Sequence, residues 1–346
     1  MVGETNYFLI SQMIDTACVV DDVAVTVVIP VWNSGDWIPA CLDSLNQQTF
    51  QDFSIVLINN GSTDGSVDRV RFQCPGNLKI VTFSINRGFA AAVNEGIRLA
   101  TSRYVALLNV DTVVDQGWLM ELIRVMEKSQ KDIGALASGM VRMDDPSLVD
   151  DAGDILSWYG SASKRGHGRS VKEYQQQAEV FSVCAGAALY RKEFFDQVGL
   201  FDEHFTSYLE DIDLCLRGRI KGYKYLYVPT AQVRHKGHSA GVVGSYYVFL
   251  MTRNRLMIFL KNISFRLLLK HLHQIAYGQL YFFMVYRKPV ASLRGYISLL
   301  FQIPHIIRSR KDILKKSRSI RQLSDSLLSS ELGEPSLVDM VKRKLQ

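Results

Sequence analysis

Short apolar runs alternate with stretches of helical spacing along the first part of the chain. Runs rich in β-branched residues predict buried strands at 23–30, 53–58, 78–83 and 104–108. Apolar residues recurring every three or four positions predict helices at 37–48, 90–100 and 118–128. This alternation predicts an α/β fold with a mostly parallel sheet flanked by helices, and a ligand cleft at the carboxyl ends of the strands.

The second half of the chain is less regular. Its pattern predicts strands at 134–143 and 223–228 and a short helix at 194–198, with a loop-rich segment at 144–160. The run at 164–169, Lys-Arg-Gly-His-Gly-Arg, is expected to form a mobile cationic loop.

The run at 104–108 ends abruptly in Asn109-Val110-Asp111. Asn109 and Asp111 are two residues apart, so on an extended backbone their side chains point to the same side. Together they offer two oxygen ligands to a divalent cation that also bridges phosphates, a role that suits Mg²⁺ or Mn²⁺. The competing interpretation is a polar strand end followed by a turn.

Two further strand ends carry amides. The loop that begins Asn59-Asn60-Gly61 can hydrogen-bond a base or a ribose, although a plain strand-to-helix turn explains it equally well. Asn86-Arg87-Gly88 precedes a predicted helix N-terminus, a place that suits a diphosphate. There is no GxGxxG or Walker lysine motif, so a dinucleotide or ATP site has little support.

Glu210-Asp211-Ile212-Asp213 places three carboxylates within four residues. On a helix, Glu210 and Asp213 share a face while Asp211 points elsewhere. Crowded acids raise one another's pKa, which suits a general base. An acidic first turn that complements the helix dipole is the competing interpretation. His235 is either a further metal ligand or a surface loop residue.

Charge is distributed unevenly along the 346 residues. Residues 253–318 carry fourteen Lys and Arg against one acid, whereas the formal charge of the whole chain is only +6. The first 252 residues therefore sum to about −7. An acidic body with a basic, apolar C-terminal segment is not the pattern of a nucleic-acid reader, whose positive charge faces its ligand.

The basic segment also predicts a location for the protein. Its apolar and aromatic residues are interspersed with Lys and Arg, which predicts amphipathic helices that lie in a membrane interface. Packing on the catalytic body, or on a second subunit in a homo-oligomer, is the competing interpretation. We expect peripheral association with the cytoplasmic face of the cell membrane.

Other features agree with this location. The first 22 residues are acidic and do not resemble a secretory signal. No window reaches about 18 uninterrupted apolar residues, so a spanning helix is not expected. The five cysteines are scattered without CxxC spacing, which argues against a zinc site or a disulfide framework and for a reducing cytoplasm.

Eight motifs stand in order between residues 25 and 262: VIPVWN at 28–33, NNGSTDGS at 59–66, NRGFAAAVN at 86–94, LNVD at 108–111, GLFDE at 199–203, YLEDIDL at 208–214, His235, and Arg253-Asn254. Each motif is weak alone. In this order they resemble the family-2 glycosyltransferases of the inverting type, most closely the bacterial rhamnosyltransferase-like members. The resemblance implies the GT-A fold, a nucleotide-diphosphate sugar donor and a divalent cation.

The resemblance also implies roles for individual residues. Those assigned to the donor nucleotide are Pro30, Val31, Asn33, Asn59, Asn86, Gly88, Phe89, Asn94 and Asn109. Asp111 is similar to the metal ligand of the family's DxD motif, with His235 as a second contact. Asp211 is similar to the catalytic base, with Glu210 beside it. The family usually has aspartate where Asn59 stands, which leaves the base preference open.

These observations predict four segments: an N-terminal segment at 1–22, a GT-A catalytic domain at 23–252, a basic amphipathic helical extension at 253–318 and a tail at 319–346. The expected reaction moves a sugar, favoured as rhamnose from dTDP-rhamnose, to a saccharide or lipid-linked acceptor in cell-surface polysaccharide synthesis. The alternatives are a sugar nucleotidyltransferase and a non-catalytic membrane-associated scaffold. A sugar nucleotidyltransferase should have a Gly-rich loop with Lys or Arg after its first strand, whereas this chain has Val31-Trp32-Asn33 there.

Overall fold

The computed structural model describes residues 13–15, 23–65, 67, 77–237, 244–314 and 332. The predicted segments 1–22 and 319–346 lie almost wholly outside the described residues.

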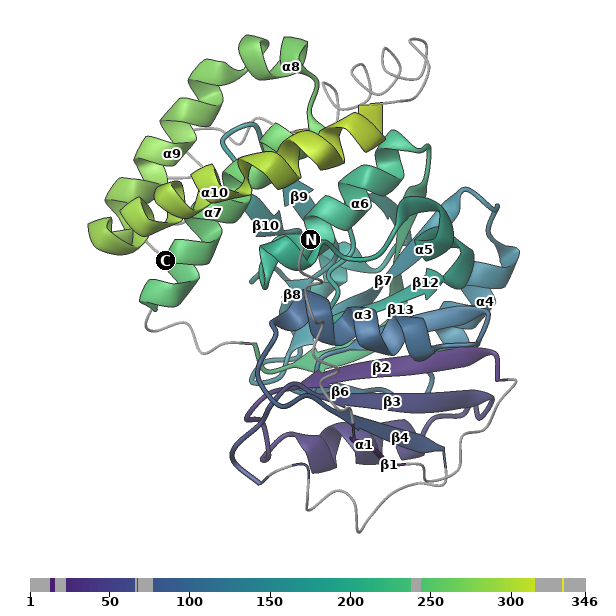
Figure 1. The fold of residues 1–346 in the computed structure, drawn as a ribbon. Coiled ribbons are helices and arrows are strands. Elements are labelled where there is room, and N and C mark those ends of the chain that lie inside the picture. Colours follow the sequence, from purple (N-terminus) through teal and green to yellow (C-terminus); the bar gives the residue numbers. More distant parts are fainter. Residues whose placement is uncertain are drawn as a thin grey trace, which may run out of the picture.

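The described residues contain an eleven-stranded sheet in the order β1-β4-β3-β2-β5-β12-β7-β13-β11, with β6 paired to β13 and β8 to β7 (Figure 1). Its strands are β1 (Met13–Asp15), β2 (Val25–Val31), β3 (Phe53–Asn59), β4 (Leu78–Thr82), β5 (Tyr104–Leu108), β6 (Thr112–Val114), β7 (Ile133–Arg142), β8 (Val149–Asp151), β11 (Ala178–Val180), β12 (Ala187–Arg191) and β13 (Lys224–His235). A separate ribbon pairs β9 (Asp154–Leu156) with β10 (Ala162–Lys164).

Parallel pairing joins β4, β3, β2 and β5, so their carboxyl ends meet at one edge of the sheet. Strand β12 enters antiparallel between β5 and β7, and β13 then pairs with β7 in parallel. The predicted α/β fold, with a mostly parallel sheet flanked by helices, is confirmed.

Helices cover both faces of the sheet because side chains alternate along each strand. Val27 and Ile29 pack towards α1 (Ile38–Asn46) and α4 (Trp118–Lys128). Val28 packs on the other side, towards α3 (Phe89–Leu99), α5 (Lys192–Val198) and α6 (Glu210–Ile220). Gly96 lets α3 approach β2 closely, because a Cβ there would lie 2.2 Å from Val28 Cγ1.

The less regular half contains more strand than its sequence pattern predicts. The segment 144–160, expected to be loop-rich, contributes β8 and β9. The strand predicted at 223–228 runs on to His235, because a bulge between Val228 and Gln232 accommodates Pro229 and restores pairing with β7. His235 therefore ends a strand and does not lie in its exit loop. Short 3₁₀ turns lie at Val171–Tyr174 and Glu203–Phe205.

The run at 164–169 is held by specific contacts, contrary to the expectation of a mobile loop. Lys164 ends β10 and forms an ion pair with Asp150 at 2.7 Å. Arg165 donates to the Ala152 carbonyl at 3.1 Å and stacks over Tyr174. The basic side chains are thus neutralised or stacked by partners distant in sequence.

Four helices form a layer beside α6, at the end of the molecule opposite β3 and β4 (Figure 1). They are α7 (Ser245–Asn262), α8 (Phe265–Lys270), α9 (Leu272–Tyr286) and α10 (Pro289–Leu314). Trp158, Ile212 and Phe259 share one core with Leu299 of α10, so this layer is packed on the sheet domain. The boundary predicted at residue 252 falls inside α7.

Helix α10 departs from the sequence-based expectation that no helix could span a membrane. Its segment Pro289–Lys311 has 23 residues and contains an 18-residue window with a mean hydropathy of 1.2, so it is long and apolar enough to cross a membrane by length and composition. One face of α10 nevertheless packs along α7, where Ser292 and Leu299 are buried. A Cβ on Gly295 would lie 2.7 Å from the Phe249 carbonyl oxygen, so the two helices are in close contact.

Candidate functional site

The loops that follow β2 and β3 are tied together at the sheet edge. Val31 pairs with Asn59 in the parallel ladder, which aligns the two strand ends. Beyond them, the Asn33 Oδ1 accepts the Thr63 amide at 2.8 Å, and the Ser62 Oγ accepts the Asn33 amide at 3.1 Å. The Asn59 Oδ1 accepts the Ser62 amide at 2.9 Å.

Asn60 links this pair of loops to the one that follows β4. Its Nδ2 donates to Asn86 Oδ1 and to the Gly88 carbonyl, both at 3.1 Å, and its Oδ1 accepts the Arg87 amide at 2.8 Å. Asn60 is buried, so it organises the loop and leaves Asn86 exposed. Sequence reasoning gave Asn60 no role of its own.

The predicted donor residues fall into three groups by exposure. Asn33 and Asn86 are exposed, Pro30, Phe89 and Asn109 are half-buried, and Val31, Asn59 and Asn94 are buried. The Asn94 amide is fully used inside the protein: it donates to the Phe201 carbonyl at 2.9 Å and accepts the Phe201 amide at 3.0 Å. Asn94 therefore fixes the segment around Phe201, and its side chain has no polar atom left to bind a nucleotide sugar.

Asn109 and Asp111 lie in a turn and not on an extended strand. Strand β5 ends at Leu108, the Thr112 Oγ1 donates to the Asn109 carbonyl at 2.6 Å, and the Asn109 amide donates to the Gly186 carbonyl at 2.8 Å. The argument that the two side chains align by strand periodicity is therefore wrong. The Asp111 carbonyl instead accepts the Lys236 amide at 3.0 Å, which sets Asp111 beside the end of β13.

Asp111 and His235 come together, as predicted, because β6 and β13 pair Thr112 with His235. The His235 Nε2 lies 3.4 Å from Asp111 Oδ1, and its Nδ1 lies 2.8 Å from Asp150 Oδ2. Burial lowers the pKa of His235, but the hydrogen bonds to Asp111 and Asp150 outweigh it and raise this pKa to about 9. A carboxylate behind a histidine fixes its ring and its tautomer, as at many metal sites.

Asp150 was missed in the sequence because it lies in the segment expected to be a loop. Burial raises its pKa, but the hydrogen bond from His235 and the charge of Lys164 outweigh this and lower it to about 2. Asp150 is 5% exposed and stays ionised between two cationic partners. An Asp-Asp pair just before a glycine turn was the only signal in the sequence.

The three carboxylates that open α6 have different surroundings. Asp213 is fully buried and pairs with Arg217 Nε at 2.9 Å, Lys261 Nζ at 2.8 Å and Asn262 Nδ2 at 2.8 Å. Glu210 is 5% exposed, and burial followed by the charge of Asp211 raises its pKa well above the usual value. Asp211 is the least buried of the three residues.

Asp211 is oriented by backbone amides. Its Oδ1 accepts the Ile212 amide at 2.8 Å, and its Oδ2 accepts the Ala185 amide at 3.4 Å. Burial raises its pKa, and these amides and the Lys164 charge partly offset that rise. A carboxylate with a raised pKa that is oriented by backbone amides has the properties of a general base.

Two buried acids lie near Asp211 on the side of β8 and β9. Burial raises the pKa of Asp151 to about 7, and the pKa of Asp154 lies well above its usual value. Both interact electrostatically with Asp211 and with Lys164. Lys164 therefore lies between the Asp150 side of the site and the Asp211 side, and its charge offsets this concentration of carboxylates.

The segment that enters α6 is strained. Thr206, Tyr208 and Leu209 have φ of 66°, 68° and 69°, which non-glycine residues seldom adopt. Thr206, with ψ of −67°, forms a γ-turn of the rarer, strained kind, in which the Ser207 amide donates to the Phe205 carbonyl at 2.8 Å. Each such residue costs about 1–3 kcal/mol, and such strain clusters at functional sites.

Gly88 contacts this strained segment. Its φ is 87°, and a Cβ there would lie 2.6 Å from the Thr206 carbonyl oxygen. The loop predicted to hold the donor and the segment that carries the predicted base are therefore in direct contact.

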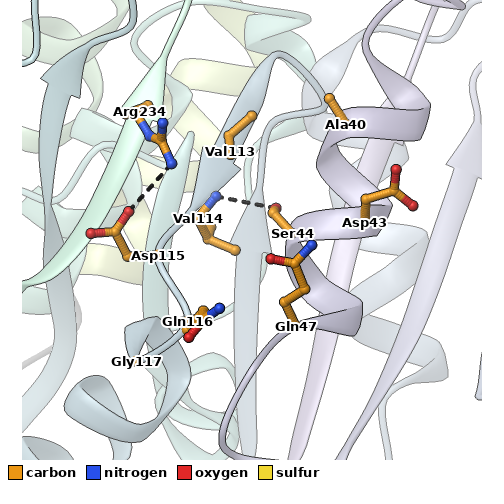
Figure 2. Close-up of a pocket in the computed structure, with 10 residues that line it drawn as sticks. All are labelled: Ala40, Asp43, Ser44, Gln47, Val113, Val114, Asp115, Gln116, Gly117 and Arg234. Atoms are coloured by element: carbon orange, nitrogen blue, oxygen red, sulfur yellow. Dashed lines mark hydrogen bonds and ion pairs between the residues drawn. The ribbon is translucent and has the colours of Figure 1, made fainter.

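Two other features lie away from these residues. A hollow of 560 Å³ lies between α1, β6 and the start of α4, with Asp43 and Gln47 on one side and an Arg234–Asp115 ion pair at 3.7 Å on the other (Figure 2). None of the predicted site residues lines it. Asp202, His204 and His305 form a cluster with metal-ligand chemistry, but Lys261 Nζ already lies 2.6 Å from the Asp202 carboxylate.

Solved structures of similar fold are glycosyltransferases. The mannosyltransferase PcManGT from Pyrobaculum calidifontis, in complex with GDP-Man and Mn²⁺, is 15% identical, with a TM-score of 0.50 over 90% of this chain and 88% of that chain. GalNAc-T7 with UDP, GalNAc and Mn²⁺ is 16% identical, with a TM-score of 0.53 over 77% of this chain and 55% of that chain. These likenesses confirm the predicted GT-A-like fold.

Two curated proteins are similar to this chain in sequence. An N-acetylglucosaminyl-diphospho-decaprenol L-rhamnosyltransferase of Mycobacterium tuberculosis is 27% identical over 239 residues, 62% of this chain and 77% of that protein. A poly-beta-1,6-N-acetyl-D-glucosamine synthase of Staphylococcus epidermidis is 28% identical over 202 residues, 58% of this chain. The matched region spans only 47% of that synthase.

The sequence model of "Glycosyl transferase family 2" matches residues 26–199. This range holds the predicted donor loops and Asp111, whereas Asp211 and His235 follow it. Because the match covers half of the chain, the protein is a member of glycosyl transferase family 2.

Proposed function

We propose that the protein inverts the anomeric centre of its donor sugar in a single displacement, with Asp211 as the catalytic base. The observation that carries this proposal is the contrast at the start of α6, where Asp213 is bound by Arg217, Lys261 and Asn262 whereas Asp211, the less buried of the two, is oriented by backbone amides. Burial raises the pKa of the Asp211 carboxyl, and the charge of Asp211 adds to the effect of burial in raising the pKa of the neighbouring Glu210.

The chemistry needs one base. The acceptor hydroxyl gives its proton to the Asp211 carboxylate while its oxygen forms a bond to the anomeric carbon. The bond from that carbon to the diphosphate oxygen breaks, and the diphosphate leaves with the electron pair. Attack from the side opposite the leaving group gives inversion.

The residues at the end of β13 fit a divalent cation, favoured as Mg²⁺ or Mn²⁺. Asp111 would supply a carboxylate oxygen and His235 its Nε2, with Asp150 holding the opposite ring nitrogen. A cation bound there supplies charge neutralisation for the leaving diphosphate. Asn109, half-buried beside Gly186, is a neighbour of this group and not a second ligand on the same strand.

The favoured donor is dTDP-rhamnose, and the favoured acceptor is a saccharide or a lipid-linked saccharide of a cell-surface polysaccharide. Support comes from the sequence likeness to the mycobacterial rhamnosyltransferase. Asn59, whose Oδ1 accepts the Ser62 amide, can accept a base N–H without the charge of an aspartate.

The test is Asp211→Asn in a sugar-transfer assay, after a thermal-shift panel of nucleotide diphosphates with Mn²⁺ or Mg²⁺ has identified the base. We expect kcat to fall at least about 1000-fold while donor affinity by calorimetry is kept. Asp43→Asn, an exposed carboxylate at the distant hollow, is the control and should keep full activity. Unchanged turnover in Asp211→Asn would refute the base, and no turnover of any nucleotide sugar by the natural protein would favour the scaffold.

The exposed apolar side chains of the C-terminal helices support a second proposal, that the protein binds the cytoplasmic face of the membrane. Of the nineteen large apolar side chains exposed in the described part of the chain, fourteen lie between Leu260 and Ile307. Phe301, Val290 and Phe265 are 79%, 69% and 68% exposed. Monomeric soluble proteins seldom expose apolar side chains at this density.

The charge of this face favours a lipid surface over a second copy of the chain as its partner. Residues 260–311 contain nine Lys and Arg and no acid. Two such surfaces would repel each other, whereas anionic lipid attracts them. Because α10 keeps its other face on α7, the helix lies along the lipid surface and does not cross it.

Cosedimentation with phosphatidylglycerol vesicles tests this location. Replacing Leu300 and Phe301 together by Ser should weaken binding at least about 10-fold, and raising the salt concentration should weaken binding of the natural protein. Met120→Ser, at an exposed apolar residue of α4, is the control and should have no effect. Protein that resists extraction by salt and alkali would mean that α10 spans the bilayer, and a dimer without vesicle binding would mean that a second copy covers this face.

A further inference from the structure

The Arg253-Asn254 motif of α7 has no role in the proposed chemistry, yet both side chains are buried against the site. Arg253 is 6% exposed and Asn254 is fully buried. They lie on a helix that follows the segment matched to the family by more than forty residues. Two buried polar side chains in a helix interior need partners, and those partners identify what the motif does.

Asn254 binds the strained segment that enters α6. Its Nδ2 donates to the carbonyls of Phe205 at 3.0 Å, Ser207 at 2.9 Å and Tyr208 at 2.8 Å. Its Oδ1 accepts Arg253 Nε at 2.9 Å, which fixes the orientation of the amide. Every polar atom of the side chain is therefore engaged.

The positive φ values explain why one amide can reach three carbonyls. In an extended chain the carbonyls of Ser207 and Tyr208 would point to opposite sides, whereas here, with positive φ at Thr206, Tyr208 and Leu209, the carbonyls of Phe205, Ser207 and Tyr208 all face the Asn254 amide. The strained backbone persists only while these carbonyls have a donor.

The start of α3, next to the loop predicted to bind the nucleotide sugar, holds the same segment from another side. The Ala90 amide donates to the Thr206 carbonyl at 3.1 Å, and the Phe89 amide donates to the Ser207 Oγ at 3.2 Å. The Leu209 carbonyl then accepts the Asp213 amide at 3.0 Å as α6 begins. Asn254 and the start of α3 thus hold the segment from two sides, two residues before Asp211.

We propose that Asn254 is a positioning residue for Asp211. Its side-chain amide holds Phe205, Ser207 and Tyr208 in the conformation that sets the first turn of α6, and Arg253 holds that amide in place. The role of Asn254 in catalysis rests on the proposed role of Asp211 as the base, whereas its hold on the segment does not.

The test compares Asn254→Ala, which removes the donor, with Asn254→Asp, which keeps the size but presents an oxygen to the carbonyls. We expect kcat to fall about 100-fold in both, because a shift of about 1 Å at a reacting group has this effect. Donor affinity by calorimetry should change less than about 3-fold. Thr252→Ala, buried on the same helix but facing Gly295 of α10, is the control and should keep its kcat.

Two readouts separate positioning from general damage. Hydrogen exchange of the peptide 203–213 should rise in Asn254→Ala and not in Thr252→Ala, while the sheet peptides stay protected. In an Asp211→Asn background, Asn254→Ala should lower the residual rate less than about 3-fold, because the group that it positions is already lost. Asn254→Ser, which keeps one donor, should lie between the natural protein and Asn254→Ala if the alanine variant folds poorly.

The outcomes are distinguishable. Unchanged exchange at 203–213, or an equal loss of rate in the natural and Asp211→Asn backgrounds, would overturn the positioning role. Full activity of Asp211→Asn alone would overturn the proposed base, and the exchange result would then still decide whether Asn254 holds the segment.

Discussion

The proposed metal site and the proposed base, called here the metal side and the base side, differ in what holds their side chains in place. Asp111 and His235 are set by the ladder between β6 and β13, so regular backbone pairing brings them to 3.4 Å. Asp211 follows three residues of positive φ, and side chains of α7 and amides of α3 hold that segment.

The two sides should therefore differ in how they respond to side-chain substitutions. A ladder tolerates most side-chain changes, because its hydrogen bonds come from the backbone. The segment before Asp211 depends instead on specific side chains, among them those of Arg253 and Asn254. We therefore expect metal affinity to respond to the ligands and their direct partners, and turnover to respond to residues of α7 that touch no substrate.

The largest expected effect separates the two sides. Asp111→Ala should weaken metal-dependent donor binding at least about 100-fold, because it removes the carboxylate ligand. Titration calorimetry with the nucleotide diphosphate and Mn²⁺ measures this, and without metal the variant and the natural protein should bind alike. If Asp111→Ala binds the nucleotide diphosphate with unchanged affinity in the presence of Mn²⁺, Asp111 is not a metal ligand.

A smaller effect is expected one contact further out. Asp150→Asn should lower the affinity for Mn²⁺ about 10- to 100-fold, because it loosens the His235 ring without removing a ligand. Metal titration by calorimetry would detect it, with the exposed Asp144→Asn as the control. Equal metal affinity in both variants would show that His235 needs no support from Asp150.

The smallest effect concerns the junction between α10 and the sheet domain. Burial raises the pKa of Asp202, but His305 and Lys261 outweigh it and hold that pKa well below the usual range; Lys261 and Arg217 likewise lower the pKa of Asp213. Carboxyls with a lowered folded pKa stabilise the protein above their unfolded pKa of about 4, and this stabilisation is lost as the pH falls below it.

Asp202→Asn should therefore lower the free energy of unfolding at pH 7 by about 2 kcal/mol, and the difference from the natural protein should shrink towards pH 3. Melting temperatures measured from pH 7 to pH 3 test this. A difference that stays constant over this range would mean that the ionised carboxylate of Asp202 contributes nothing.

The regular part of the fold follows from local pattern. The helix predicted at 118–128 is α4, and the strand predicted at 134–143 differs from β7 by one residue at each end. Both elements carry long apolar patterns, and buried parallel strands read as continuous apolar runs. The predicted strand at 223–228 was shorter than β13 because Pro229 interrupts the strand pattern in the sequence. The strand continues beyond Pro229 because it pairs with β7, which is distant in sequence.

The site was predictable where a motif carries its own chemistry and not where a partner acts from a distance. Asp111 and His235 were expected to meet, and they do. Asp150 and Asn254 act through residues 85 and about 47 positions away, a separation at which no periodicity operates. Asn94 shows the opposite error: its place in a motif suggested donor binding, yet its amide is bonded to Phe201.

The contact between Gly88 and Thr206 determines where this chain can be recombined with a relative. A chimaera that takes its first two hundred residues from one parent and its remainder from another must keep glycine at position 88, because a Cβ there would lie 2.6 Å from the Thr206 carbonyl oxygen. The parent that supplies the remainder must bring its own asparagine at position 254, because that amide holds the same segment from the other side.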